Sequence, residues 1–201
     1  MILYFAPRSP FAIKVRIVIH ELGLGDAVRL VATDPWSDDA LRALNPLCKV
    51  PTLVLEDGVV VYDSPVICEV LNERAGGDIV PSSGARRLEA LRLQALSDGL
   101  SEAVIRRFVE RLGPVNERSD RVAVRQDRVI ESVLDALDAG PSLRELSSVG
   151  EIATAAALVY LSFRSPEIAW REGRPKLARW YAEIQPRLSM AATRIAGPAA
   201  T

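Results

Sequence analysis

One stretch, residues 45–65, constrains the fold of this chain more than any other. Val50-Pro51 precedes an apolar run typical of a strand, where a proline fits because the first residue need not donate to the ladder. Asp57-Gly58 then joins two β-rich runs and is a strong hairpin signal. Asp63-Ser64-Pro65 favours a helix directly after the second strand, with the serine as N-cap and the proline at the first helical position. The stretch therefore predicts strand, hairpin, strand and capped helix in immediate succession.

The rest of the first half alternates strand and helix patterns. Residues 2–5 and 28–31 are short β-rich runs, and apolar residues between 11 and 22 recur at helical spacing. A short helix is expected at 38–44 and a longer one at 65–74, which gives the order β-α-β-α-β-β-α. Strands separated by helices are expected to pair in parallel, and the two hairpin strands antiparallel.

The second half lacks strand signals. Helical patterns follow one another at 85–112, 121–137, 152–163 and 175–184, with prolines and glycines between them. Ser148 and Glu151 form a capping box in front of an almost wholly apolar helix, which should be buried. We therefore predict an α/β domain over residues 1–78, a linker at 79–84 and an all-α helical domain over 85–201.

Composition excludes several function classes. The formal net charge of −1 gives poor support for a nucleic-acid or anionic-membrane partner. No apolar run reaches the roughly 18 residues that a spanning helix needs, and no signal peptide is recognisable at the N-terminus. With two cysteines outside any metal spacing and one histidine, no metal site is expected. A cytoplasmic protein without a metal is the expectation.

Ser9 stands directly before the first helical pattern. As an N-cap, its hydroxyl would lie at the positive end of the helix dipole, beside backbone N–H groups without helical partners. A thiol bound there would be driven toward thiolate, because a helix N-terminus lowers a thiol pKa from its usual value of about 8.5. Capping alone would also explain Ser9, and Tyr4 is a competing hydroxyl. The absence of cysteine from residues 8–12 argues against a thiol–disulfide oxidoreductase.

Val50-Pro51 is a second candidate feature. An X-Pro bond is the one peptide bond whose cis form costs only about 0.5–1 kcal/mol. A cis bond would turn the backbone of Val50 outward, so that its N–H and C=O could pair with an extended peptide as an added strand. A trans proline that opens an edge strand is the simpler alternative.

Asp63 and Ser64 are a third candidate feature, at the predicted start of the helix. Unpaired N–H groups and the Ser64 hydroxyl can hold a carboxylate there, while Asp63 can pair with an ammonium group. Together they suit the two charges of an α-amino acid. A simple helix cap is the alternative.

Three motifs in combination resemble the glutathione S-transferase family, and most closely its serine-type bacterial cytosolic enzymes. They are Ser9-Pro10-Phe11, Asn45-Pro46-x-x-Lys49-Val50-Pro51 and Asp63-Ser64-Pro65. The capping box at Ser148 and Glu151 is similar to the family's Ser/Thr-x-x-Asp box, with Glu in place of Asp. The resemblance covers nearly the whole chain and implies a thioredoxin-like N-terminal domain followed by an all-helical domain that contributes the electrophile pocket.

The resemblance also implies a function and site residues. Glutathione would be the co-substrate, without a metal, and its thiolate would attack a small electrophile, a reaction used in detoxification. Ser9 would hydrogen-bond the sulfur, and Val50 beside Pro51 would pair with the cysteinyl backbone. Asp63 and Ser64 would hold the γ-glutamyl end.

Two further residues have weaker support. Lys49 could attract the glycine carboxylate of glutathione, and Glu102 could reach across a homodimer to the amino group. A solvated surface position is at least as good an explanation for each. Other readings of the same resemblance are a glutathione-dependent isomerase or dehalogenase, or a non-catalytic binding module.

Overall fold

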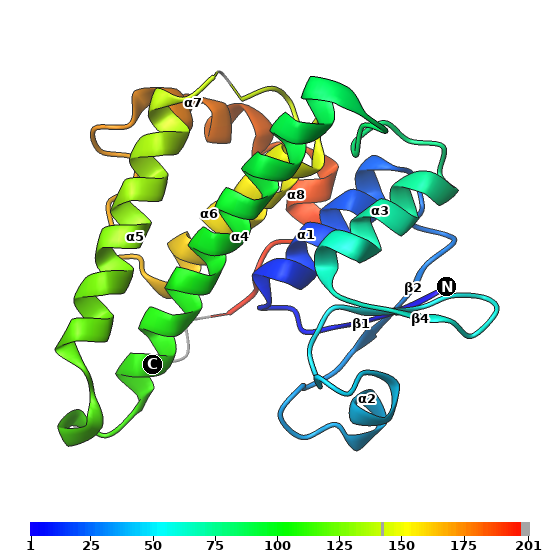
Figure 1. Ribbon diagram of the computed structural model, residues 1–201, viewed down its shortest axis with the longest axis horizontal. Coiled ribbons are helices and arrows are strands. Elements are labelled where there is room, and N and C mark those ends of the chain that lie inside the picture. The colour runs from blue at the N-terminus through cyan, green and yellow to red at the C-terminus, as the bar shows by residue number, and fades with distance from the viewer. Residues whose placement is uncertain (142, 198–201) are drawn as a thin grey trace.

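The computed structural model describes residues 1–141 and 143–197; residues 142 and 198–201 of the predicted helical domain lie outside that part. The first half of the chain has the predicted order β-α-β-α-β-β-α (Figure 1). Its elements are β1 (Ile2–Phe5), α1 (Pro10–Glu21), β2 (Arg29–Ala32), α2 (Asp39–Leu44), β3 (Thr52–Val54), β4 (Val60–Val61) and α3 (Ser64–Arg74).

The regular structure of the described second half is helical, with no strand. Its elements are α4 (Gly84–Leu112), the 3-10 helix η1 (Val115–Glu117), α5 (Asp120–Ala139), α6 (Val149–Arg164), α7 (Pro175–Ile184) and α8 (Leu188–Ala192). The prediction is confirmed for α7 at both ends, and α6 begins three residues earlier than predicted. The short elements η1 and α8 have no sequence period long enough to predict them.

The four strands form one mixed sheet in the order β2-β1-β3-β4. β1 pairs in parallel with β2, and β3 pairs antiparallel with β4, both as predicted. β3 also pairs antiparallel with β1, so the prediction that helix-separated strands run in parallel is wrong for this pair.

The short helix α2 explains the direction of β3. A helix of six residues is only about 9 Å long. In Figure 1, α2 lies on the side of the sheet away from α1 and α3 and does not carry the chain back over that face. The chain leaves the sheet after Ala32, beside Phe5, and re-enters it at Thr52, opposite Tyr4. Since exit and re-entry are at the same edge, β3 must run opposite to β2.

The start of α3 differs by one residue from the prediction. The helix begins at Ser64, and the N-cap position belongs to Asp63, whose side chain makes no capping hydrogen bond. Ser64 is therefore the first helical residue and not the N-cap. Assignments of helix ends differ by a residue or two. Neither side chain, however, makes a hydrogen bond that caps the helix.

The segment between α3 and α4 is held against both halves of the chain. The side chain of Asn72 makes two hydrogen bonds with the backbone of Val80: it donates to the carbonyl and accepts from the N–H, both at 3.2 Å. The N–H of Val149, at the start of α6, donates to the carbonyl of Ile79 at 2.7 Å. A domain boundary at 79–84 stays a prediction.

Helices α4 and α6 cross at close range. A Cβ added at Gly150 would lie 2.7 Å from the Ala90 carbonyl oxygen, so a larger residue there would force the two helices apart. Next to this crossing the hydroxyls of Ser97 and Thr154 share a buried hydrogen bond of 2.8 Å. No described helix combines the length and apolar character that a membrane span requires.

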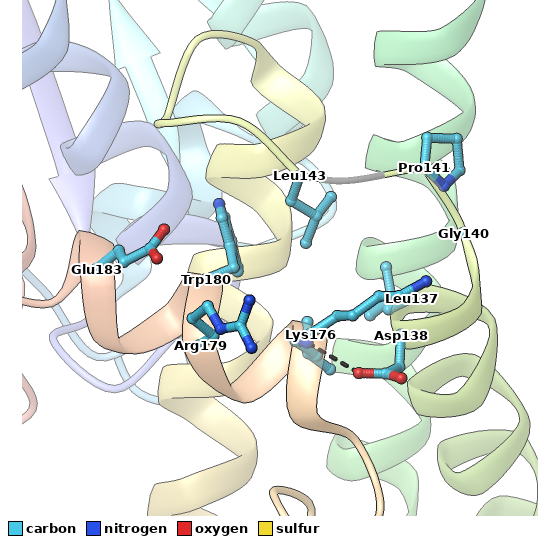
Figure 2. A pocket seen from close by; sticks show the side chains of 10 residues that line it. Leu137, Asp138, Gly140, Pro141, Leu143, Lys176, Arg179, Trp180 and Glu183 are labelled. Carbon is cyan, nitrogen blue, oxygen red and sulfur yellow. Dashed lines mark hydrogen bonds between the residues drawn. The ribbon is translucent and has the colours of Figure 1, made fainter.

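A hollow of about 210 Å³ lies between the end of α5 and α7 (Figure 2). Its walls serve to join these helices: Asp138 accepts a hydrogen bond from the Leu177 N–H at 2.9 Å, and the indole of Trp180 donates to the Arg144 carbonyl at 2.7 Å. Its walls come from the helical half alone and include none of the predicted site residues. We therefore regard this hollow as part of the packing between α5 and α7 and assign it no functional role.

Candidate functional site

The predicted site residues meet at one edge of the sheet. The register pairs Tyr4 with Thr52 and Leu53 with Val61. The end of β1, the start of β3 and the end of β4 therefore lie side by side. The loops that leave this edge carry the Ser9, Val50 and Asp63 motifs, which are far apart in sequence.

Ser9 is the N-cap of α1, as predicted. Its backbone is extended (φ −79°, ψ 122°), and its Oγ accepts a hydrogen bond from the N–H of Ala12 at 3.3 Å. Because the oxygen acts as the acceptor in this bond, the hydroxyl hydrogen stays available for a further acceptor. The side chain is half-buried at the positive end of the helix.

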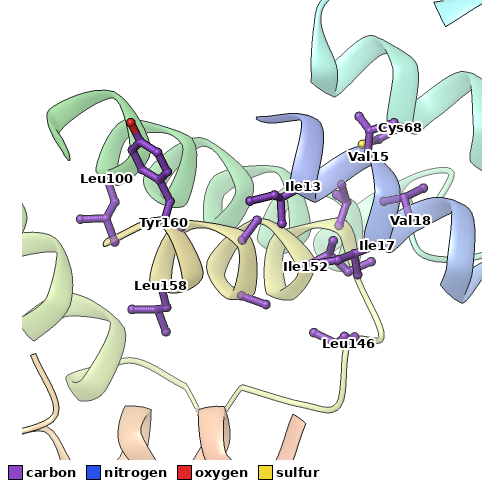
Figure 3. Close-up of a cluster of buried hydrophobic side chains, with 14 of the residues drawn as sticks. Ile13, Val15, Ile17, Val18, Cys68, Leu100, Leu146, Ile152, Leu158 and Tyr160 are labelled. Atoms are coloured by element: carbon purple, nitrogen blue, oxygen red, sulfur yellow. The ribbon is translucent and has the colours of Figure 1, made fainter. Parts of the chain in front are cut away.

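Helix α1 is fixed from both sides, which fixes the position of Ser9. Its residues Ile13 and Val18 are fully buried, together with Cys68 of α3 and Ile152 of α6 (Figure 3). A helix that is buried on opposite faces cannot rotate without opening the core. The sheet half and the helical half thus share this helix.

The Val50–Pro51 peptide bond is cis in the structure. Within the described residues, no hydrogen bond uses the N–H or C=O of Val50. The loop before it is held by Asn45, whose amide donates to the Lys49 carbonyl at 3.2 Å and to the Thr52 hydroxyl at 2.9 Å. The backbone of Val50 is thus presented at the edge by a fixed loop, as strand addition requires.

The remaining predicted residues lie at different depths. Asp63 is exposed, whereas Ser64 is only 2 % exposed, and the first turn of α3 begins at this edge beside that of α1. Two helix N-termini at one edge favour a bound anion. Lys49 is exposed at the end of the fixed loop. Tyr4, the competing hydroxyl, is half-buried within β1.

A buried ion pair near this edge was missed by sequence reasoning. The ammonium of Lys14 lies 2.6 and 2.9 Å from the two carboxylate oxygens of Asp98, which joins α1 to α4. Lys14 is 1 % exposed and Asp98 19 %. Burial raises the pKa of Asp98, the charge of Lys14 opposes the rise, and the negative charge of Asp63 adds to it.

Helical spacing could have located Asp98. Glu102, the acid predicted to act on this helix, lies one turn further along α4 and so shares a face with Asp98. Glu102 is exposed and makes no ion pair within the described residues. The acid of this helix face that is paired within the chain is Asp98, which binds Lys14, and the role of Glu102 stays a prediction.

The two free cysteines differ in burial, and Cys68 is not suited to act as a nucleophile. Cys68 is fully buried, and burial raises the pKa of its thiol to about 12. Cys48 is half-buried, with its sulfur 3.1 Å from the Pro35 carbonyl oxygen. The described residues contain no group of three or more side chains suited to hold a metal ion.

Comparisons with known proteins show the family to which the chain is related. The family model for the glutathione S-transferase N-terminal domain matches residues 8–74, the segment that holds all three motifs. The uncharacterised GST-like protein YibF of Escherichia coli K12 is 30% identical over 191 residues, which are 92% of this chain and 94% of that protein.

The chain belongs to the glutathione S-transferase family.

Solved structures of the family are similar over the whole chain. A glutathione transferase family member from Pseudomonas fluorescens Pf-5, with bound glutathione, is 36% identical with a TM-score of 0.92, covering 98% of this chain and 99% of that one. A glutathione S-transferase from Methylobacterium radiotolerans, in complex with glutathione sulfonate, is 33% identical with a TM-score of 0.90, covering 100% and 97%. This family member thus has the thioredoxin-like N-terminal fold and the helical second half that the sequence predicts.

Proposed function

We propose that this family member is a glutathione transferase that binds glutathione at the sheet edge and activates its thiol as thiolate. The single observation that carries the proposal is the convergence of three different devices at that edge. They are the capped start of α1 at Ser9, the unpaired backbone of Val50 and the start of α3 at Asp63 and Ser64.

Each device matches one part of glutathione. The Ser9 hydroxyl can donate to the sulfur while its oxygen stays engaged with the Ala12 N–H, and both the hydrogen bond and the helix dipole favour the thiolate. The backbone of Val50 suits the cysteinyl residue. The N–H groups of α3, with Ser64, suit the γ-glutamyl carboxylate, and Asp63 suits its ammonium. Lys49 would attract the glycine carboxylate.

The proposed reaction is attack of the thiolate on an electrophilic carbon of a second substrate. The proposed location of the protein is the cytoplasm. Isomerisation or dehalogenation would use the same thiolate. A non-catalytic glutathione-binding module is the candidate of another class. It would bind glutathione without lowering the pKa of the thiol, and the Ser9 experiment separates the two.

The decisive experiment replaces Ser9 with alanine. Ser9→Ala should keep glutathione binding by calorimetry, raise the pKa of the bound thiol in a pH titration of thiolate absorbance, and slow conjugation at neutral pH by roughly ten- to a thousandfold. Ser83→Ala is the matched control, because Ser83 is also an N-cap residue but makes no capping hydrogen bond. Unchanged conjugation in Ser9→Ala would move the role to Tyr4 or to backbone donors.

A homodimer is part of the proposal. Val66 of α3 and Leu88 of α4 are large exposed apolar side chains. Val66 also lines, with Val70 and Arg87, a hollow of about 590 Å³ between α3 and the start of α4. A second subunit seated there would bring its own α4, and with it Glu102, toward the first subunit's site. Light scattering should give a dimer mass for the wild type and a monomer mass for Val66→Glu.

A further inference from the structure

Arg164, the last residue of α6, is partly buried and has two guanidinium nitrogens without an acceptor. Its Nε and Nη1 are buried and donate no hydrogen bond within the described residues. Two other arginines of the helical half pair with carboxylates: Arg107 with Asp127 and Glu167, and Arg174 with two carboxylates of α5. Buried N–H groups of a charged side chain cost free energy when they have no acceptor. The unpaired Nε and Nη1 of Arg164 therefore point to an acceptor that the chain itself does not supply for them.

Aromatic rings hold this guanidinium in place. Its Cζ lies 3.9 Å from the ring centroid of Phe108 on α4 and 5.0 Å from that of Phe163. The ring of Tyr160 is 5.9 Å away. Burial raises the pKa of Tyr160, while the charge of Arg164 and a hydrogen bond between the two side chains oppose the rise, so this neighbour stays a neutral phenol. Stacking orients a guanidinium and offsets part of its burial cost, but rings supply no acceptor for its N–H groups.

The position of Arg164 connects it to the proposed site. The ring of Phe163 contacts a second guanidinium, that of Arg8, at 5.6 Å, and Arg8 directly precedes Ser9. Arg164 therefore lies across one phenyl ring from the side chain of Arg8, the neighbour in sequence of the candidate thiol-activating residue. The surrounding side chains come from α4, α6 and the loop before α1, so the helical half and the sheet half meet here.

We propose that Arg164 recognises the carboxylate of the electrophile, so that the second substrate is a carboxylate-bearing molecule whose reactive carbon faces the thiolate. This inference rests on the proposed function. A carboxylate is the acceptor whose geometry best fits a guanidinium, and water-poor aromatic surroundings strengthen the pairing. The apolar rings would contact the body of the substrate, while Arg164 selects its charge.

The test uses two electrophiles that differ only in charge, 4-chloro-3-nitrobenzoate and 4-chloro-3-nitrobenzamide. In each, the glutathione sulfur bonds to the ring carbon that carries chlorine, and chloride leaves with the electron pair of the broken bond. Rates are divided by the uncatalysed rate with glutathione, which removes the difference in intrinsic reactivity. The wild type should favour the benzoate by about 10- to 100-fold in kcat/KM, the range for a hydrogen bond to a charged group.

Arg164→Gln should abolish this preference while the rate with the amide is kept, which also shows that the variant is folded. Arg171→Gln is the matched control, because Arg171 is likewise stacked, with its Cζ 4.1 Å from the ring centroid of Trp170, but is exposed. This control should keep the preference of the wild type. An equal loss of rate with both electrophiles in Arg164→Gln would show a structural role and overturn the assignment.

A binding measurement without glutathione separates this inference from the proposed function. Calorimetry with 3-nitrobenzoate and 3-nitrobenzamide should show tighter binding of the carboxylate to the wild type and no difference in Arg164→Gln. If no conjugation occurs with either electrophile, the transferase proposal fails and this binding comparison alone decides the role of Arg164. Equal binding of the two compounds by the wild type would overturn it.

Discussion

At the scale of single residues, Asp63 combines a special position with a free side chain. It occupies the N-cap of α3, yet its carboxylate makes no capping hydrogen bond and is exposed at the sheet edge. Most N-cap aspartates are engaged with the first turn of their helix. An unengaged carboxylate beside the N–H groups of the same turn can bind an ammonium group while the turn binds a carboxylate.

Asp63→Asn should therefore weaken glutathione binding by about 1–3 kcal/mol, the range for a lost charge-assisted hydrogen bond. The Michaelis constant for the second substrate should barely change, because Asp63 is expected to contact glutathione and not the electrophile. Calorimetric titration with glutathione measures the effect, and Asp39→Asn, an exposed aspartate in the first turn of α2, is the control. If Asp63→Asn bound glutathione with wild-type affinity, Asp63 would have no role in binding and would only mark the start of the helix.

At the scale of elements, the start of α6 depends on one buried glutamate. Glu151 is 6 % exposed and accepts hydrogen bonds from the Arg144 N–H at 2.7 Å and the Ser147 hydroxyl at 2.9 Å. Ser148 accepts from the Glu151 N–H at 3.5 Å, so half of the predicted capping box is present. The carboxylate reaches back to the preceding loop and not to the N-cap N–H, and it thereby ties that loop to the helix.

Glu151→Ala should lower the free energy of unfolding by about 2–4 kcal/mol, because it removes the carboxylate that accepts two hydrogen bonds from the preceding loop, those of the Arg144 N–H and the Ser147 hydroxyl. For a chain of this size that corresponds to a fall in Tm of roughly 4–16 °C. Glu145→Ala, a change at an exposed position of the same loop, should stay within about 0.5 kcal/mol. Scanning calorimetry of both variants measures the two losses of stability. A loss in Glu151→Ala as small as that in Glu145→Ala would contradict the prediction.

A second interaction between elements, a pair of salt bridges, joins α4 to the segment after α6. Glu167 accepts hydrogen bonds from Arg107 at 2.7 Å and Arg111 at 2.8 Å. Burial raises the pKa of Glu167, but the hydrogen bonds and charge of the arginines outweigh it and bring the pKa to about 2. Because the folded-state pKa is depressed from 4.5, the stabilisation is present above pH 4.5 and is lost as the pH falls from there to about 2.

Glu167→Gln should therefore cost stability at pH 7 and much less at pH 2.5. The side chain is 47 % exposed, so solvent screening keeps the difference at neutral pH below about 1 kcal/mol. Urea unfolding of wild type and variant across this pH range measures the difference, with the exposed Glu172→Gln as control. A difference that stays constant with pH would show that the ion pairs contribute nothing.

At the scale of the whole molecule, the Lys14–Asp98 pair joins the two halves of the chain. Lys14 belongs to α1, whose N-terminus carries Ser9, and Asp98 lies on α4. The position of the sheet edge relative to the helices that cover it thus depends on a charged contact as well as on apolar packing. Breaking such a pair leaves one buried charge uncompensated, which costs more than the pair itself contributes.

Lys14→Met should lower the free energy of unfolding by about 3–5 kcal/mol, and adding Asp98→Asn should restore much of the loss because the uncompensated carboxylate is then removed. Arg86→Met, which breaks an exposed pair with Asp78, should cost less than about 1 kcal/mol. Chemical unfolding of the four variants, including Asp98→Asn alone, gives the coupling energy. A coupling near zero would contradict a role in holding the two halves together.

The sequence by itself determined the features that local interactions fix. Asp57-Gly58 predicted the hairpin, because the turn conformation depends on these residues alone, and Gly58 has the expected positive φ of 84°. Ser9 predicted its own capping role, because an N-cap bonds to the turn that follows it. The order of strands and helices followed from local periodicity. The residues of the proposed glutathione site were found for the same reason: each belongs to a turn or helix start with a local signature.

Tertiary structure alone decided the features that depend on contacts between distant segments. The antiparallel direction of β3 follows from where the chain re-enters the sheet, which no local pattern records. Lys14 and Asp98 are 84 positions apart, and each reads in the sequence as an ordinary surface charge. Arg164 shows its missing acceptor only once α4, α6 and the loop before α1 are assembled around it. Burial turns these charges into specific interactions, and burial is a property of the assembled fold.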